Sequence, residues 1–400
     1  MRRGVLSVLA VAALVAMGQL MMAAPEVIGV GQEEVLTGGF YRFAVACDRL
    51  DQPHVVAQVG YNGGASQLWT LYDRVNGQWQ TTAFNFGQYY QPAAEYVFTH
   101  IEIDSVSDRA WISGVGFGAG SQATCAIGVM VRNNVSTAPS GVTFKATKVN
   151  TSVPLGNLSL APNVHDRAYV YVNFGKGQSQ IWQNGIIQHG PVVSTLIKKN
   201  CSERMIYGFK ISKAPKAGYP DGVWHASTVG HPGLAGMGLR WNEYQNSVRE
   251  NNGQGYLIWG DPATYPGHEE HNYGALGTDN VNPEAAYFAI YGHNGYIYVN
   301  MYDGNSLAYP ANNMYRLPSS ADSGARRYAP SFASAKGGGA WLCYVKDGQI
   351  MLCYFNVDGT VGDPIQVCPG VLPAIATDSK GDIHIAYYNA TGARYRKVDV

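Results

Sequence analysis

The chain has 400 residues, a formal net charge of zero and only 14% charged side chains. Since 46% of its residues are hydrophobic and 12% are aromatic, it is too apolar for an intrinsically disordered protein. The balanced charge also argues against a protein that holds nucleic acid by bulk electrostatic attraction, so we expect no nucleic-acid partner.

The first 24 residues (1–24) predict a secretory signal peptide. A pair of arginines precedes an apolar run over residues 5–22, and small residues follow at Ala23 and Ala24. Cleavage beside Ala24 or after Gly18 fits this pattern, and an uncleaved membrane anchor is the alternative. No later stretch of about 18 apolar residues occurs. We therefore expect a secreted or periplasmic protein without an integral membrane span once the signal is removed.

Internal repetition begins early in the chain. Residues 108–112, Asp-Arg-Ala-Trp-Ile, recur at 166–170 as Asp-Arg-Ala-Tyr-Val. An element that contains glycine, serine and glutamine occurs three times, with its serine at positions 66, 121 and 179, which are 55 and 58 residues apart. Such spacing indicates structural units of similar length.

The C-terminal part repeats at a shorter interval. Residues 330–333, Pro-Ser-Phe-Ala, match Pro-Ala-Ile-Ala at 373–376, 43 residues later. Each unit has the pattern of a strand, a glycine-containing turn and a second strand of alternating aromatic or β-branched residues. Two further pairs follow in the same register, Trp341 with His384 and Tyr344 with Tyr387.

Repeats of 43 to 58 residues with several short strands each predict an all-β fold, a β-propeller. Residues 25–400 then form a single propeller domain, with room for seven blades and a range of six to eight. We expect an N-terminal strand near residues 40–47 to complete the last unit. The repeat fades over residues 196–280, where we expect long loops. A pair of packed β-sandwiches is the alternative fold.

The chain contains six cysteines, which are few for a scaffold built on disulfides. Cys343 and Cys353 flank the hairpin-turn signal at 347–348, and their even separation predicts that they share one face of two strands. A disulfide and a buried thiol pair both fit that arrangement. No cysteine spacing of a zinc site occurs, so we assign no metal to these residues.

The unit Pro-x-apolar-Ala-x(4)-Gly-x-apolar-x-apolar-x-x-Tyr at 330–344 and 373–387 resembles the repeat of secreted Asp-box (BNR-type) propellers. This superfamily includes sialidases, other glycosidases and uronate-cleaving polysaccharide lyases of the ulvan-lyase kind. The resemblance implies a propeller that acts on carbohydrate. Neither the Asp box, Ser-x-Asp-x-Gly-x-Thr-Trp, nor the Phe/Tyr-Arg-Ile-Pro motif of sialidases occurs, so no sialidase residue is carried over.

Two histidines are candidates for a catalytic base. His100 lies in an alternating strand pattern, and His165 precedes the Asp-Arg pair of the next unit. Loops of neighbouring blades converge on one mouth of a propeller, so both histidines can share a site with Tyr273. A lyase needs a base that removes the proton beside a uronate carboxylate and a donor that neutralises this carboxylate. Purely structural roles for His100 and His165 are the alternative.

The middle of the chain contains candidate substrate-binding residues. Arg240, Trp241 and Tyr244 combine a guanidinium with aromatic rings, which suit an acidic group and a sugar face. His271 ends the polar run 268–271, which lacks the histidine spacing of a zincin helix. We assign no metal there and expect no cofactor, with a structural divalent cation as the open alternative.

These features favour a carbohydrate-active propeller that cleaves a polysaccharide by β-elimination or hydrolysis, with a polysaccharide or glycan as its partner. Hydrolysis would require two carboxyl groups that face each other across the channel. The first alternative is a non-catalytic propeller of the cell envelope that binds glycan or protein, and the second is a structural or adhesion protein. An enzyme requires that the candidate residues share one pocket.

Overall fold

The computed structural model shows an all-β protein, which confirms the predicted fold class. The described residues form thirty strands in six antiparallel sheets and contain no helix, hence none that is long and apolar enough to cross a membrane. The structure describes residues 24–36, 40–59, 68–85, 93–104, 108–118, 124–150, 158–163, 167–176, 181–189, 194–198, 205–213, 222–231, 234–245, 248–250, 255–259, 274–291, 295–310, 313–320 and 330–400.

Four of the sheets contain four consecutive strands each. The first contains β3 (Phe40–Cys47), β4 (Pro53–Val59), β5 (Leu68–Val75) and β6 (Gln78–Asn85), and the second contains β7 (Ala93–Asp104), β8 (Arg109–Gly118), β9 (Thr124–Asn133) and β10 (Ser140–Asn150). The two others contain β20 (Gly274–Thr278), β21 (Ala286–Tyr291), β22 (Tyr296–Tyr302) and β23 (Tyr315–Pro318), and then β24 (Ser331–Ser334), β25 (Ala340–Lys346), β26 (Gln349–Phe355) and β27 (Ile365–Pro369).

One sheet has nine strands. They are β11 (Leu158–Asn163), β12 (Arg167–Lys176), β13 (Ile181–His189), β14 (Ser194–Lys198), β15 (Met205–Lys213), β16 (Gly222–His231), β17 (Leu234–Gln245), β18 (Val248–Glu250) and β19 (Gly255–Trp259). Strands β13 and β15 meet at a single residue pair, Trp182 with Met205, so the sheet consists of two consecutive sets, β11–β14 and β15–β19. This arrangement is compatible with seven blades, and the blade number itself stays a prediction.

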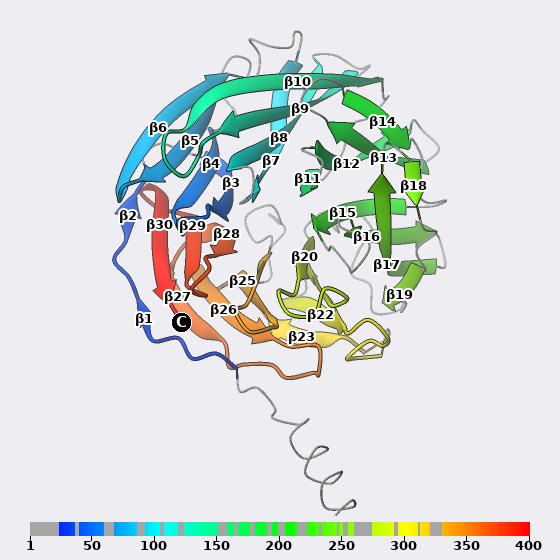
Figure 1. The fold of residues 1–400 in the computed structure, drawn as a ribbon. Helices are drawn as coiled ribbons and strands as arrows, with labels where there is room; N and C mark the ends of the chain where they lie inside the picture. Colours follow the sequence, from blue (N-terminus) through cyan, green and yellow to red (C-terminus); the bar gives the residue numbers. More distant parts are fainter. Residues whose placement is uncertain are drawn as a thin grey trace, which may run out of the picture.

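The sixth sheet joins the two ends of the described chain. It contains β28 (Val371–Thr377), β29 (Ile383–Asn389) and β30 (Gly392–Asp399), with β1 (Gly29–Val30) and β2 (Glu34–Val35) at its outer edge. All sheets radiate from a ring of inner strands (Figure 1). In this ring β3 contacts β7, and the contacts continue through β11, β15, β20, β24 and β28 back to β3. Such a closed ring of radial sheets is a β-propeller.

The sheet of β24–β27 is apolar on both faces because a neighbouring sheet covers it on either side. Strand β25 is buried from its first residue through its sixth. Its Leu342 and Tyr344 pack with Tyr287 of β21, whereas the intervening Cys343 packs with Ile385 of β29. Alternate residues of one strand therefore stabilise two different cores, which explains the high aromatic and low charged content of the chain.

The hairpin turn predicted at 347–348 is present, and a second turn of the same kind lies at 76–77. Their two central residues have φ values of 51° and 76° at 76–77 and of 51° and 72° at 347–348. Positive φ at both positions is what a two-residue type I′ turn requires, which explains the Asn-Gly and Asp-Gly pairs.

The two repeated C-terminal units are equivalent in the structure. Ala333 of β24 pairs with Trp341, and Ala376 of β28 pairs with His384 in the same register. Both units also place their aligned aromatic or histidine residues in the interior, namely Trp341, His384, Tyr344 and Tyr387. The sequence repeat therefore corresponds to a repeat of strand pairing and of burial.

The prediction that Cys343 and Cys353 share a face is wrong. Across the two-residue turn Lys346 pairs with Gln349, so Cys343 pairs with Leu352, the neighbour of Cys353. Paired residues point to the same face and consecutive residues to opposite faces, so an even separation across this turn places the two cysteines on opposite faces. Each lies in a different core, and both are free thiols.

We expect the purified protein to contain at least four free thiols. Four cysteines are free thiols in the structure, namely Cys47, Cys343, Cys353 and Cys368. Burial raises the pKa of Cys343, and burial together with the charge of Asp363 raises the pKa of Cys353 to about 12, so both thiols should react only after unfolding. Alkylation with and without denaturant, followed by intact mass measurement, checks this. Fewer than four modified cysteines in unreduced, denatured protein would contradict it.

The strand that completes the sixth sheet differs from the predicted one. Residues 40–47 form β3, the inner strand of the first sheet, instead. The outer edge of β30 is paired by β1 and β2, with Gly29 opposite Asp399. We call residues 24–36 the closing strap. Because β1 and β2 have two residues each, no alternating pattern marks them as strands in the sequence.

Two consecutive glutamates attach the closing strap. The Glu33 carboxylate accepts hydrogen bonds from the Tyr387 hydroxyl (2.6 Å) and from Nε of Arg394 (3.0 Å), both in the sixth sheet. Glu34 accepts one from Arg74 of the first sheet (2.6 Å). The strap therefore joins the sixth sheet to the first at the outer edge, in addition to the contact of β28 with β3 at the inner edge.

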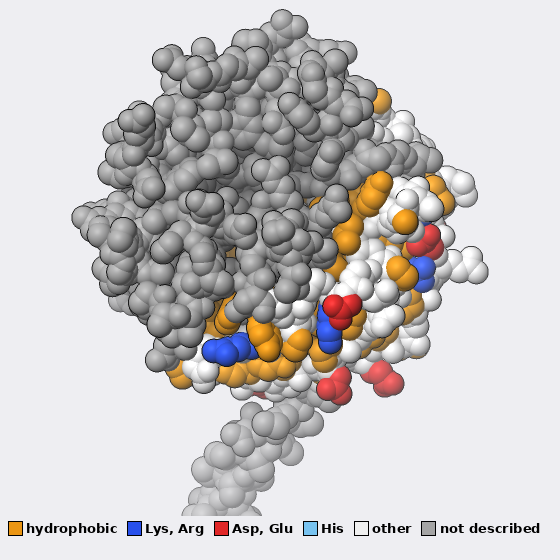
Figure 2. Space-filling view, turned by 180° about the vertical axis from the view of Figure 1, so that it is seen from behind, with side chains coloured by type: hydrophobic (Ala, Val, Ile, Leu, Met, Phe, Trp, Pro, Cys, Tyr) orange, Lys and Arg blue, Asp and Glu red, His pale blue; other side chains and the backbone are white. Residues whose placement is uncertain are grey.

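The described surface has no large area of one charge on the face shown in Figure 2. Lys, Arg, Asp and Glu side chains are scattered there as single groups among hydrophobic ones. This agrees with the zero net charge of the chain. Long-range steering of a polyanion by this part of the surface is therefore not expected.

Candidate functional site

The structure describes some of the predicted site residues and not others. His165, His271 and Tyr273 lie outside the described residues. The others are described as strand positions only: His100 in β7, and Arg240, Trp241 and Tyr244 in β17. Their assigned roles stay predictions.

The strand order places His100 and Arg240 at different distances from the central axis. His100 belongs to β7, an inner strand of the ring. Arg240 belongs to β17, which follows β15 and β16 outward in its set. Along the ring, β11 lies between β7 and β15, so the two residues come from sets that are not neighbours. One ligand that contacts both would have to extend past the intervening set β11–β14.

A cluster of buried charged side chains, which the sequence analysis did not single out, lies at the junction of the first two sheets. His54 of β4 is 1% exposed, and each of its ring nitrogens faces a carboxylate. Nδ1 lies 2.8 Å from Oδ1 of Asp73, and Nε2 lies 3.1 Å from Oδ2 of Asp48. The other oxygen of Asp73 bonds Arg132 of β9 in the second sheet. We call these four residues the His54 cluster.

The His54 cluster organises the turn between β3 and β4. Oδ1 of Asp48 accepts the backbone amides of Leu50 (2.8 Å) and Gln52 (2.9 Å), while its Oδ2 faces His54. The Gln52 side chain donates to the Ser136 carbonyl (3.1 Å), in the turn after β9. The turn therefore ties the first sheet to the second through side chains.

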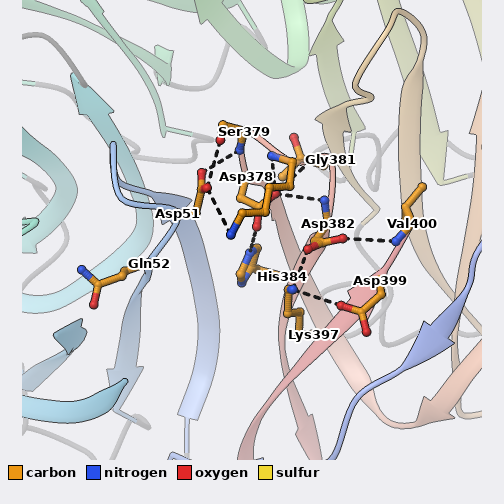
Figure 3. A network of polar contacts seen from close by, with 12 residues as sticks. Asp51, Gln52, Asp378, Ser379, Gly381, Asp382, His384, Lys397, Asp399 and Val400 are labelled. Carbon is orange, nitrogen blue, oxygen red and sulfur yellow. Dashed lines mark hydrogen bonds and ion pairs between the residues drawn. The ribbon is translucent and has the colours of Figure 1, made fainter. Parts of the chain in front are cut away.

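A related arrangement occurs in the sixth sheet (Figure 3). Oδ1 of Asp378 accepts three backbone amides of residues 380–382, and its Oδ2 lies 3.2 Å from Nε2 of His384. The second ring nitrogen of His384 faces a hydroxyl instead of a carboxylate, since Nδ1 lies 2.6 Å from the Tyr395 oxygen. Both histidines thus face an aspartate six residues earlier in the sequence. The second partner differs, being the Asp73 carboxylate for His54 and the Tyr395 hydroxyl for His384.

Side chains also tie the sixth sheet to the first at this end of the strands (Figure 3). Asp51 accepts the amide (2.8 Å) and the hydroxyl (2.9 Å) of Ser379. Lys397 bridges Asp382 (2.5 Å) and Asp399 (3.0 Å). The Asp51 contacts stabilise the seam that the closing strap spans at the outer edge, whereas Lys397 and its two partners all belong to the sixth sheet and its turn.

The carboxyl groups of these clusters have shifted pKa values. Burial alone would raise the pKa of Asp73, but the hydrogen bond from His54 and the charge of Arg132 outweigh burial and lower it. Burial is likewise outweighed at Asp48 and Asp378, whose pKa values are lowered by hydrogen bonds from a histidine and from backbone amides. All three carboxylates are ionised at neutral pH and engaged in structural bonds.

Among the described residues, no group of three or more metal-ligating side chains is arranged to hold an ion.

The closed ring of radial sheets defines the class of this protein as a β-propeller. No family model matches the chain, and no curated protein matches it.

Solved structures of similar fold include the BP39L lectin from Burkholderia pseudomallei, with a TM-score of 0.51 and 12% identity over 89% of this chain and 98% of the lectin. The GH93 α-L-arabinofuranosidase of Fusarium graminearum has a TM-score of 0.49 and 7% identity over 90% of this chain and 92% of its own. The α-L-arabinanase of Penicillium chrysogenum has a TM-score of 0.48 and 9% identity over 94% and 98%. The likeness to the lectin concerns the fold alone.

Proposed function

We propose that this β-propeller binds glycans outside the cytoplasm. The observation that carries the proposal is the likeness in fold to a lectin over 89% of the chain. The predicted signal peptide supports an extracytoplasmic location, and the aromatic content of the chain supplies rings of the kind that pack on sugar faces.

Three of the described buried carboxylates can be excluded as the catalytic pair of a glycosidase. A glycosidase needs two carboxyl groups about 5–10 Å apart, with oxygens directed at the substrate. Asp48, Asp73 and Asp378 instead direct their oxygens at histidine, arginine and backbone amides inside the protein. These three groups are therefore not available as a catalytic pair.

Cleavage by β-elimination is a second candidate, and the position of His100 on an inner strand favours it. In this function His100 or His165 acts as the base and Tyr273 assists the proton transfer, while Arg240 is the predicted donor that neutralises the uronate carboxylate. Because His100 and Arg240 come from sets that are not neighbours, His100 can be the base only with a donor closer to it than Arg240. Trp241, Tyr244 and His271 then contribute to substrate binding.

The test uses the protein expressed with its own leader and purified after export. A glycan array and a panel of acidic and neutral polysaccharides are screened for binding, for absorbance near 235 nm and for new reducing ends. We expect binding without turnover. An absorbance signal that His100→Ala lowers by on the order of 100-fold or more would establish the lyase instead. Absence of both binding and turnover across the panel would contradict both functions.

A further inference from the structure

The two hydrogen-bond partners of the His54 ring determine its protonation state. A neutral imidazole carries one N–H donor and one acceptor nitrogen, whereas an imidazolium carries two donors. Both ring nitrogens of His54 face carboxylate oxygens, at 2.8 Å and 3.1 Å, and ionised carboxylates only accept hydrogen bonds. Only the charged form of His54 can therefore donate to Asp73 and Asp48 at once.

We propose that His54 is a proton-dependent latch: as an imidazolium it holds the junction between the first two sheets closed, and its deprotonation loosens this junction. The inference is separate from glycan binding, since no residue of the His54 cluster belongs to the predicted ligand site.

Charge balance in the cluster supports this assignment. With His54 protonated, two cations, His54 and Arg132, face two anions, Asp48 and Asp73, and the buried group is neutral. Loss of the proton leaves a net negative charge in a site where every member is at least 90% buried, and one carboxylate then faces a lone pair. The next charged groups outward, Arg49 and Asp108, form a partly exposed pair at 3.5 Å.

The direction of the His54 pKa agrees with this geometry. Burial alone would lower the pKa of His54, but the hydrogen bonds and charges of Asp48 and Asp73 outweigh burial and raise the pKa above its ordinary value of 6.5. A group with a raised folded pKa stabilises the folded state fully below its unfolded pKa. That contribution is lost as the pH rises from about 6.5 through the raised value. The latch is therefore closed in mild acid and weakened in alkali.

His384 provides a matched control within the same chain. It has the same aspartate partner six residues earlier, but its other nitrogen faces the Tyr395 hydroxyl, which can donate as well as accept. A neutral His384 satisfies both partners, by donating to Asp378 and accepting from Tyr395. The turn at 380–382 should therefore not share the pH dependence of the turn at 48–52.

Hydrogen exchange followed by mass spectrometry tests the latch in the unmodified protein. The rates are first corrected for intrinsic exchange. The equilibrium constant for local opening at the Leu50 and Gln52 amides should then rise by up to tenfold per pH unit from about pH 6.5 to the raised pKa of His54. Above that pKa the constant should stay level. The amides of residues 380–382 should show no such rise. An equal response in the two turns would overturn the proposal.

Nitrogen-15 labelling of histidine supplies a direct readout by NMR. The ring signals of His54 should change from imidazolium to neutral at a pH above the ordinary value of about 6.5, and a transition at or below that value would overturn the proposal. The Asp73→Asn variant, in which one anion is removed, should abolish the pH dependence at residues 48–52, whereas His384→Gln should leave it unchanged. Because the unmodified protein is titrated, the proposal remains testable even if Asp73→Asn does not fold.

Discussion

Replacement of Gly339 by alanine is expected to lower the free energy of unfolding by about 3 kcal/mol, through backbone strain and overpacking. Gly339 has a φ of 84°, and an added Cβ would lie 2.5 Å from ring carbons of Tyr354. That ring has no room to move. Tyr354 is 2% exposed, donates its hydroxyl to the Gly338 carbonyl (3.0 Å) and packs edge-on against Trp341, with ring centroids 5.5 Å apart.

Gly348→Ala separates strain from overpacking. Gly348 has a similar φ of 72°, but an added Cβ there would meet no atom within 4 Å. The expected loss is the backbone contribution alone, about 1 kcal/mol. Urea unfolding of both variants measures the difference. Equal losses would mean that the Tyr354 ring yields to the added methyl group.

Glu33→Ala should lower the free energy of unfolding by about 2 kcal/mol, because it removes the acceptor that attaches the closing strap to the sixth sheet. The variant leaves the Tyr387 hydroxyl and Nε of Arg394 without their carboxylate partner. Hydrogen bonds to charged groups contribute about 1.5–3 kcal/mol each. Since the Glu33 side chain is 33% exposed, water replaces part of what is lost, and we expect a loss below the summed range of about 3–6 kcal/mol for the two bonds.

Glu26→Ala is the control for the strap. Glu26 is an exposed carboxylate of the same segment, and its removal should change stability by no more than about 0.5 kcal/mol. Limited proteolysis should also cut the strap faster in Glu33→Ala than in Glu26→Ala. Indistinguishable variants in both measurements would show that main-chain pairing alone holds the strap.

The propeller could be predicted because each unit has the same packing environment. The match of residues 330–333 with 373–376 reflects equivalent inner strands, and Trp341 and His384 occupy the same register opposite them. A sheet that is covered on both faces repeats its apolar pattern wherever it recurs. The repeat in the sequence is therefore a direct consequence of the repeated burial.

Other features depended on details that a local pattern does not contain. The even separation of Cys343 and Cys353 did not predict their faces correctly. In a hairpin, the face on which a residue lies depends on the length of the turn as well as on the separation in sequence. The strands of the closing strap were not predicted, because their pairing with β30 defines them and no alternation of apolar and polar residues marks them in the sequence.

The His54 cluster had a partial signal, because Asp-x(5)-His occurs at both 48–54 and 378–384. Its second carboxylate is 19 residues from His54, and the arginine is a further 59 residues away from that carboxylate. No local motif connects positions at those distances. Of the predicted ligand site, His100 alone among the described positions falls on an inner strand, and His165, His271 and Tyr273 lie outside the described residues.

The pairing of the closing strap with β30 has a consequence for how the ring is assembled. Glu33 and its partner Tyr387 are separated by 354 positions, so this contact closes a very long loop, and contacts of that kind form slowly. Synthesis of the chain begins at the N-terminus, so the strap is made long before β28–β30. The strap must therefore remain unpaired until β30 is available, and the outer edge of the sixth sheet can be covered only then.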